Sequence, residues 1–177
     1  MKTEITYQYI LVSALAVILS FLFHELTHFL TGEVLGYNMK MTLNSASLIN
    51  GNYNNALHQN IVSISGPIFT IIQAIIFYYI IKKNGNYLLY PFLFVPFLMR
   101  VMAMVVSIFN ANDEARVSEW LGIGKWTLPI LIIAFLFFLV YKCSKQQKYT
   151  LKFNIINYLL ATVFLSTVVL LNQKFIA

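Results

Sequence analysis

The sequence has few acidic residues and little charge of either sign. Charged residues make up 10% of its 177 residues, against roughly 25% in soluble domains. The acidic residues are Glu4, Glu25, Glu33, Asp113, Glu114 and Glu119. None lies between residues 34 and 112, so long segments can lie in lipid without burying a carboxylate. The composition argues against a water-soluble fold and makes each remaining carboxylate informative.

Cysteine is also scarce. Cys143 is the single cysteine, which excludes an internal disulfide and a site of several thiolates; we interpret it as a small packing residue near a helix end. The net charge of +6 comes from Lys and Arg at the ends of apolar runs. This pattern favours lipid headgroups over nucleic acid, so we expect a lipid bilayer as a partner and no nucleic acid.

What the sequence has is long apolar runs. A membrane-spanning helix needs about 20 apolar residues, and five segments come close to that length. They are residues 7–30, 60–81, 88–109, 126–142 and 154–172. We therefore predict an all-α integral membrane protein with about five transmembrane helices. The first run is interrupted by His and Glu, and we expect it to be retained rather than cleaved as a signal peptide.

The connections between these runs differ in character. Residues 36–57 are rich in Asn, and segments 39–43 and 45–49 within them can be extended, which predicts a short membrane-dipping hairpin. Residues 110–125 form a polar loop that begins a short helix. We find no internal repeat and predict one domain over residues 1–177. Its catalytic core covers about 7–120, and accessory spans cover about 126–172.

The first span contains the sequence His24-Glu25-Leu26-Thr27-His28. Residues four apart project from one helix face, so His24 and His28 can hold one metal ion, and Glu25 can reach water beside it as a general base. Alternatively, the two histidines are polar residues satisfied by neighbours near a helix end. A Glu and two His in an apolar span are costly unless they have a function, which favours the zinc site.

Two histidines leave a zinc ion one protein ligand short. Asp113 and Glu114 follow the third span, on the same membrane side as His28 if each run crosses once. Asp113 is the better candidate, because Asn110-Ala111-Asn112 can turn the chain back toward the bundle, and Glu114 is next. A solvated loop or a helix N-cap is the alternative for this pair. Glu33 and His58, which we place in a loop, are weaker options.

Several further residues are candidates for auxiliary or substrate-binding roles. Ser65-Gly66-Pro67 opens the second span on the same side and permits a close helix approach. Thr70 and Gln73 follow as inward-facing polar residues, with helix packing as the alternative, and for Gly66 packing and a direct catalytic role are equally favoured. Arg100, within the third span, needs a carboxylate partner or binds substrate backbone. The full set is Glu114, Gly66, Pro67, Thr70, Asn110, Asn112 and Arg100.

Together these motifs resemble the site-2 protease family, the intramembrane zinc metalloproteases, over about residues 15–120. The resemblance implies that His24, His28 and Asp113 bind one Zn²⁺ per chain and that Glu25 activates water. It also implies that residues 37–55 form a membrane-dipping strand region that pairs with an extended substrate. The sequence departs from the family at Thr70, where Asn is usual, and at Asp113-Glu114, where Asp-Gly is common.

The function implied is an intramembrane zinc metalloendopeptidase, which cleaves a peptide bond in or near a transmembrane segment of another membrane protein. The alternative is a non-catalytic zinc-binding membrane protein that binds a partner helix or handles metal. Glu25 favours the enzyme, because a structural zinc site needs no base. We expect a multi-pass protein of a bacterial cell membrane, and the sequence leaves its oligomeric state open.

The orientation in the membrane stays open at this point. One side of the predicted topology carries Lys2, Lys82, Lys83, Lys142, Lys145, Lys148 and Lys152. The other carries Lys40, Arg116, Lys125 and Lys174. The positive-inside rule puts the first side in the cytoplasm and the motif near the outer surface. The family resemblance puts the motif nearer the cytosol.

Overall fold

The protein is a helical bundle with one small hairpin, seen here in a computed structural model that describes residues 4–175. The helices are α1 (Tyr7–Val34), α2 (Ala56–Asn84), α3 (Tyr90–Val106), α4 (Asp113–Trp120), α5 (Thr127–Gln146) and α6 (Leu151–Phe175). A 3-10 turn, η1 (Tyr87–Leu89), precedes α3, and the strands are β1 (Met39–Thr42) and β2 (Ser45–Leu48). Within the described residues, five helical segments are long and apolar enough to cross a membrane, and α4 is too short to do so. The predicted all-α architecture and its hairpin are confirmed, with limits shifted by a few residues.

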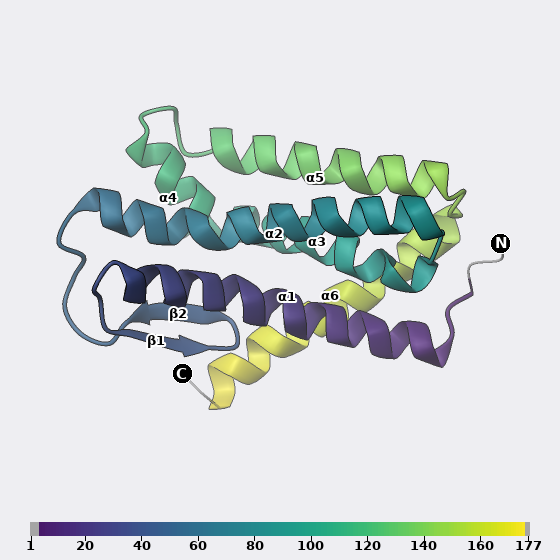
Figure 1. Cartoon of the computed structure of the whole chain (residues 1–177), viewed down its shortest axis with the longest axis horizontal. Coiled ribbons are helices and arrows are strands. Elements are labelled where there is room, and N and C mark those ends of the chain that lie inside the picture. The colour runs from purple at the N-terminus through teal and green to yellow at the C-terminus, as the bar shows by residue number, and fades with distance from the viewer. Residues whose placement is uncertain (1–3, 176–177) are drawn as a thin grey trace.

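The elements that carry the motifs gather at one end of the bundle. Helices α1, α2, α3 and α5 follow the long axis, and α6 crosses them obliquely (Figure 1). The hairpin, α4 and the C-terminal end of α1 lie together at the end opposite the N-terminus. Helix α2 contacts both α1 and α4. His28 and Asp113 therefore lie at the same end of the bundle, with His28 Nε2 and Asp113 Oδ2 3.4 Å apart.

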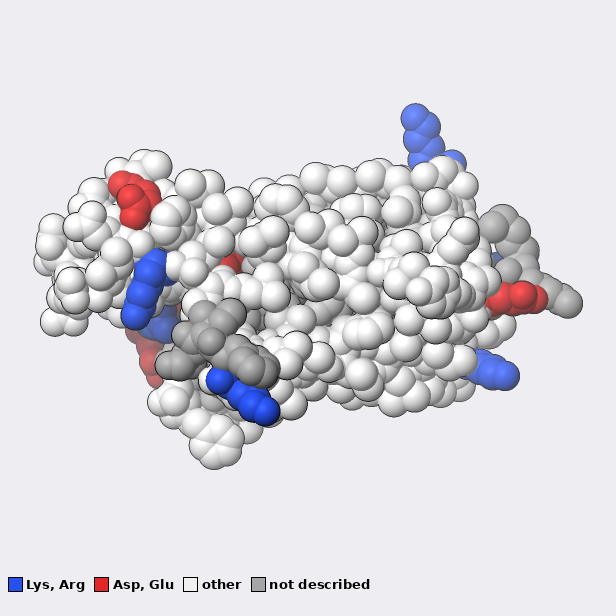
Figure 2. Space-filling model, turned by 90° about the horizontal axis from the view of Figure 1, so that it is seen from below, with Lys and Arg blue, Asp and Glu red and all other residues white. Residues whose placement is uncertain are grey.

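The outer surface of the bundle is apolar, as helices surrounded by lipid require. Leu131, Val163 and Leu170 are each about 60% exposed on α5 and α6, whereas Leu93 and Leu136 are fully buried between helices. Figure 2 shows charged side chains toward the two ends of the long axis, with a broad uncharged band between them. Lys2, which entered the count of charges on each side, lies outside the described residues.

Local capping explains where α2 begins and ends. The Asn55 side chain accepts a hydrogen bond from the backbone N–H of His58 (2.8 Å), an N-cap that satisfies a free donor of the first turn. Gly85 ends the helix in the left-handed conformation (φ 66°), which glycine adopts without a Cβ penalty. The prediction that His58 lies in a loop is wrong, because this cap draws it into the first helical turn.

The hairpin is fastened to the end of α1. Strands β1 and β2 pair antiparallel, with Met39 opposite Leu48, and Asn44 lies in the turn between them. The Glu33 carboxylate accepts a hydrogen bond from the Met39 backbone N–H (2.7 Å). Glu33, considered above as a weaker ligand, thus holds the hairpin instead of joining the histidines.

Candidate metal centre

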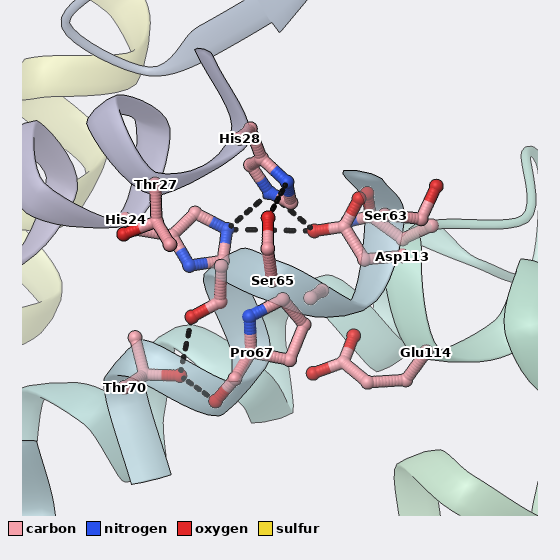
Figure 3. Close-up of polar contacts among 12 residues, drawn as sticks. His24, Thr27, His28, Ser63, Ser65, Pro67, Thr70, Asp113 and Glu114 are labelled. Atoms are coloured by element: carbon pink, nitrogen blue, oxygen red, sulfur yellow. Dashed lines mark hydrogen bonds and ion pairs between the residues drawn. The ribbon is translucent and has the colours of Figure 1, made fainter. Parts of the chain in front are cut away.

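His24, His28 and Asp113 converge at the end of the bundle where the hairpin lies. The Nε2 atoms of His24 and His28 are 3.2 Å apart, and each lies 3.4 Å from Oδ2 of Asp113. Figure 3 shows the three side chains pointing at one another from α1 and α4. No other group of His, Cys, Asp and Glu in residues 4–175 has such convergent ligand atoms.

The spacing of these atoms fits one small divalent ion. Donors that lie about 2.0–2.1 Å from a tetrahedral zinc ion lie roughly 3.3–3.4 Å from one another, and the three observed separations are 3.2, 3.4 and 3.4 Å. Two imidazoles and a carboxylate suit zinc, and three protein ligands leave a coordination position open. The three donor atoms could therefore hold one metal ion and leave a coordination position open.

The ring of His28 is held by a backbone carbonyl. Its Nδ1 lies 2.6 Å from the carbonyl oxygen of Val62 and 3.3 Å from the hydroxyl of Ser65. A carbonyl only accepts, so Nδ1 carries the proton and Nε2 keeps its lone pair for a metal. The Nδ1 atom of His24 is buried without a hydrogen-bond partner in the described residues, so this ring depends on packing for its orientation.

That packing comes from Gly66 on α2. A Cβ added there would lie 2.5 Å from Cε1 of His24 and even closer to Nε2 of His28. The prediction that Ser65-Gly66-Pro67 opens the second span is wrong: α2 begins nine residues before Ser65, at Ala56, because the Asn55 cap starts it there. The predicted close approach of the two helices at Gly66 is present. Pro67 has no backbone N–H to donate within the helix, and its carbonyl accepts a hydrogen bond from the Thr70 hydroxyl (2.8 Å).

Asp113 and Glu114 take different partners although they are adjacent. Asp113 is the first residue of α4 and points at the histidines, whereas Glu114 forms a buried ion pair with Arg100 (2.9 Å). Arg100 also lies 3.8 Å from Asp113 and 3.4 Å from Nε2 of His24. Of the two roles considered for Arg100, pairing with a carboxylate is the observed one. Of the two candidate ligands, Asp113 has the metal-binding geometry.

The Asp113 side chain is held in its charged form. Burial favours the neutral acid, but the imidazoles of His24 and His28 beside it outweigh the effect of burial and hold the pKa of this carboxyl well below its usual range. A carboxylate is the form that can bind a metal ion.

Glu25 faces two cavities that meet at the histidines. A cavity of about 220 Å³ is lined by Glu25, Asn44, Asn112, Asp113 and other residues of α2 and α4. A second, of about 290 Å³, shares these four residues and extends between α1, α3 and α6. Glu25 itself is 7% exposed. Its carboxylate is therefore near the three ligands and also next to space that a peptide could occupy.

The remaining candidates divide into those near the site and those away from it. Asn112 lines both cavities, whereas Asn110 is exposed and lines neither. Gln73 donates to the Ser20 hydroxyl (2.7 Å), one helical turn before His24 on α1, and to the Phe92 carbonyl on α3 (2.9 Å), so it joins three spans. These contacts support a packing role for Gln73.

Sequence reasoning missed several residues that line the cavities. Arg116 borders the smaller one, and its position three residues after Asp113, on one helix face, could have indicated this. Leu165, Val169 and Gln173 of α6 border the larger one, and no sequence signal marks them. The contact of the Val62 carbonyl with His28 could not be predicted from the sequence either, because every residue has a backbone carbonyl.

Comparison with known proteins found no similar family, no similar curated protein and no similar solved structure.

Proposed function

We propose that this chain is an intramembrane zinc metalloendopeptidase, which cleaves a peptide bond in or near a transmembrane segment of a membrane protein. The observation that carries the proposal is the triangle of His24, His28 and Asp113 donor atoms, 3.2–3.4 Å on each side, with Glu25 facing the adjoining cavities. A structural zinc site needs neither an open position nor a neighbouring base.

In this proposal each residue has a separate task. His24, His28 and Asp113 hold zinc, which supplies Lewis-acid polarisation of a peptide carbonyl and makes nearby water more acidic. Glu25 removes a proton from the attacking water while the water oxygen forms a bond to the carbonyl carbon. It then passes that proton to the amine nitrogen as the carbon–nitrogen bond breaks. Water is consumed, and two peptide ends are released.

The surroundings suit a substrate from the membrane. The larger cavity has apolar walls, which include Phe21, Met99 and Leu165. Asn44, Ser45 and Ala46 of the hairpin line the smaller cavity beside Glu25. A helical substrate hides its carbonyls, so it must extend before cleavage. We propose that the extended segment pairs with the edge of β2, which brings its backbone past Glu25.

Reconstitution tests this function directly. The purified chain is placed in liposomes with a set of single-span membrane proteins, and new chain ends are detected by mass spectrometry. We expect cleavage that disappears when a chelator strips the metal and returns when zinc is added. Cleavage that survives complete removal of metal, or no cleavage of any substrate by zinc-loaded protein, would favour the non-catalytic zinc-binding alternative. A bacterial cell membrane stays the predicted location.

A further inference from the structure

Arg116 is a guanidinium without an ion-pair partner at the edge of the candidate active site. It lies on α4, partly buried, and lines the smaller cavity together with Glu25, His28 and Asp113. Its Nη1 donates to the Ser63 hydroxyl (2.6 Å). Its Nη2 donates to the Ala111 carbonyl (3.3 Å). Both acceptors are neutral, and no carboxylate in residues 4–175 forms an ion pair with Arg116.

This isolation distinguishes Arg116 from the other arginine at the site. Arg100 is almost fully buried, and Glu114 neutralises it at 2.9 Å. The two bonds that Arg116 makes fix the side chain but leave further N–H donors of its guanidinium unused. Such donors, held in a fixed plane at a cavity wall, suit the two oxygens of a carboxylate.

The charges around the cavities favour one more negative group. Glu25, Asp113 and Glu114 contribute three negative charges, and Arg100 and Arg116 contribute two positive charges. The protein groups thus carry one net negative charge, with neutral histidines. A divalent ion at His24, His28 and Asp113 changes this to one net positive charge, which a single carboxylate would balance.

The two cavities also differ in the chemistry of their walls. Besides the residues that line both cavities, Ser45, Ser63 and Arg116 make the wall of the smaller cavity mainly polar. Phe21, Met102, Val106, Leu165 and Val169 make the wall of the larger one mainly apolar. A peptide that passes Glu25 would therefore have apolar residues on one side of the site and a polar group on the other.

We infer that Arg116 binds a carboxylate of the substrate peptide, so that the site selects apolar segments with an acidic group close to the cleaved bond. The inference rests on the proposed function, because it deepens the substrate class of that same site. The carboxylate comes from an Asp or Glu side chain or from a free C-terminus. The second source would make the enzyme trim chain ends.

Peptide binding tests the inference without requiring turnover. The full chain carries Glu25→Gln, is loaded with zinc in detergent, and is titrated with fluorescent apolar peptides while anisotropy is measured. The neutral peptide has Gln at every tested position and an amidated C-terminus. A second set has Glu in place of Gln at each position in turn, and a third peptide has a free C-terminal carboxylate. We expect at least one carboxylate peptide to bind about tenfold or more tightly than the neutral one.

The variants assign that gain to a residue. Arg116→Gln, added to the same chain, should make the affinities for the carboxylate peptide and the neutral peptide equal to within about twofold. Arg116→Lys should keep part of the preference for the carboxylate peptide. Lys125→Gln is the matched control: its ammonium lies over the Trp126 ring (5.2 Å) and outside both cavities, so the preference should be unchanged. A gain with Glu identifies a side chain as the source, and a gain with the free end identifies a C-terminus.

Two results would overturn the inference: equal binding of all peptides, or a carboxylate preference that persists in Arg116→Gln. Cleavage by the chain with Glu25 intact is measured separately on the same peptides. If none is cleaved while the Arg116-dependent preference holds, the proteolytic function fails and the carboxylate site stands. If peptides are cleaved with no preference, the function stands and the carboxylate site fails.

Discussion

The Nδ1 atom of His28 on α1 lies 2.6 Å from the carbonyl oxygen of Val62 on α2. This bond joins two spans and fixes which ring nitrogen of His28 faces His24 and Asp113. Metal-binding histidines commonly have such a partner, which orients the ring and makes it a better ligand. The second helix therefore prepares the candidate metal site before any ion binds.

Zinc analysis tests whether these histidines bind the metal. The purified chain should contain about one zinc ion, and His24→Ala or His28→Ala should reduce the content to near zero, because two donors hold zinc poorly. His58→Ala is the control: His58 contacts the Tyr37 hydroxyl (2.8 Å) and is not part of the cluster. Stoichiometric zinc in a chain that lacks both His24 and His28 would refute the site.

Asp113 and Glu114 provide a test between neighbouring residues. Asp113→Asn removes a charged donor, and zinc affinity should fall by more than the ~10–100-fold typical of losing an outer partner. Glu114→Gln should retain zinc but lower the melting temperature, since it weakens a buried pair whose disruption costs about 3–5 kcal/mol. Metal titration and thermal unfolding on both variants separate these effects. The opposite ranking of zinc affinities would make Glu114 the ligand.

Gly66 should control metal binding through space alone. Alanine is a better helix former than glycine by about 1 kcal/mol, so Gly66→Ala should not weaken α2. Its Cβ would instead push the His24 and His28 rings apart, and zinc content should drop sharply. Gly32→Ala is the matched control, because its Cβ meets the flexible side chain of Met39, which can move. Normal zinc binding in Gly66→Ala would show that the rings tolerate a wider approach.

The sequence predicted those parts of the molecule that depend on local pattern. Apolar run length located the five candidate spans, and the spacing of His24 and His28 placed both on one face. Counting spans brought Asp113 to the same end. These inferences succeeded because helix periodicity and bilayer thickness are strong constraints on any apolar chain.

Other features depend on contacts that no local pattern carries. The sequence predicts the second span only over residues 60–81 and places Gly66 and Pro67 near its opening, because both residues signal an interruption. In the structure the Asn55 cap and packing against α1 carry one helix from Ala56 through both residues. The pairing of Arg100 with Glu114 depends on the mutual rotation of α3 and α4. The α6 residues line the larger cavity because α6 crosses the bundle obliquely, and no local pattern predicts that crossing.

Glu25 separates an enzyme from a metal-binding protein, because zinc itself does not need it. Glu25→Gln keeps the size and polarity of a buried side chain but removes the base, so folding and zinc content should stay near normal. Cleavage should fall by about 10²–10⁴-fold, the usual contribution of general-base catalysis. Membrane-protein fragments are compared by proteomics in cells that express either form, with zinc measured in both purified proteins. Substrates should accumulate uncleaved with the variant and co-purify with it, since binding persists while hydrolysis stalls. If membrane-protein processing is the same in both cell lines and the variant supports every phenotype of the unaltered chain, the metal serves a non-catalytic role.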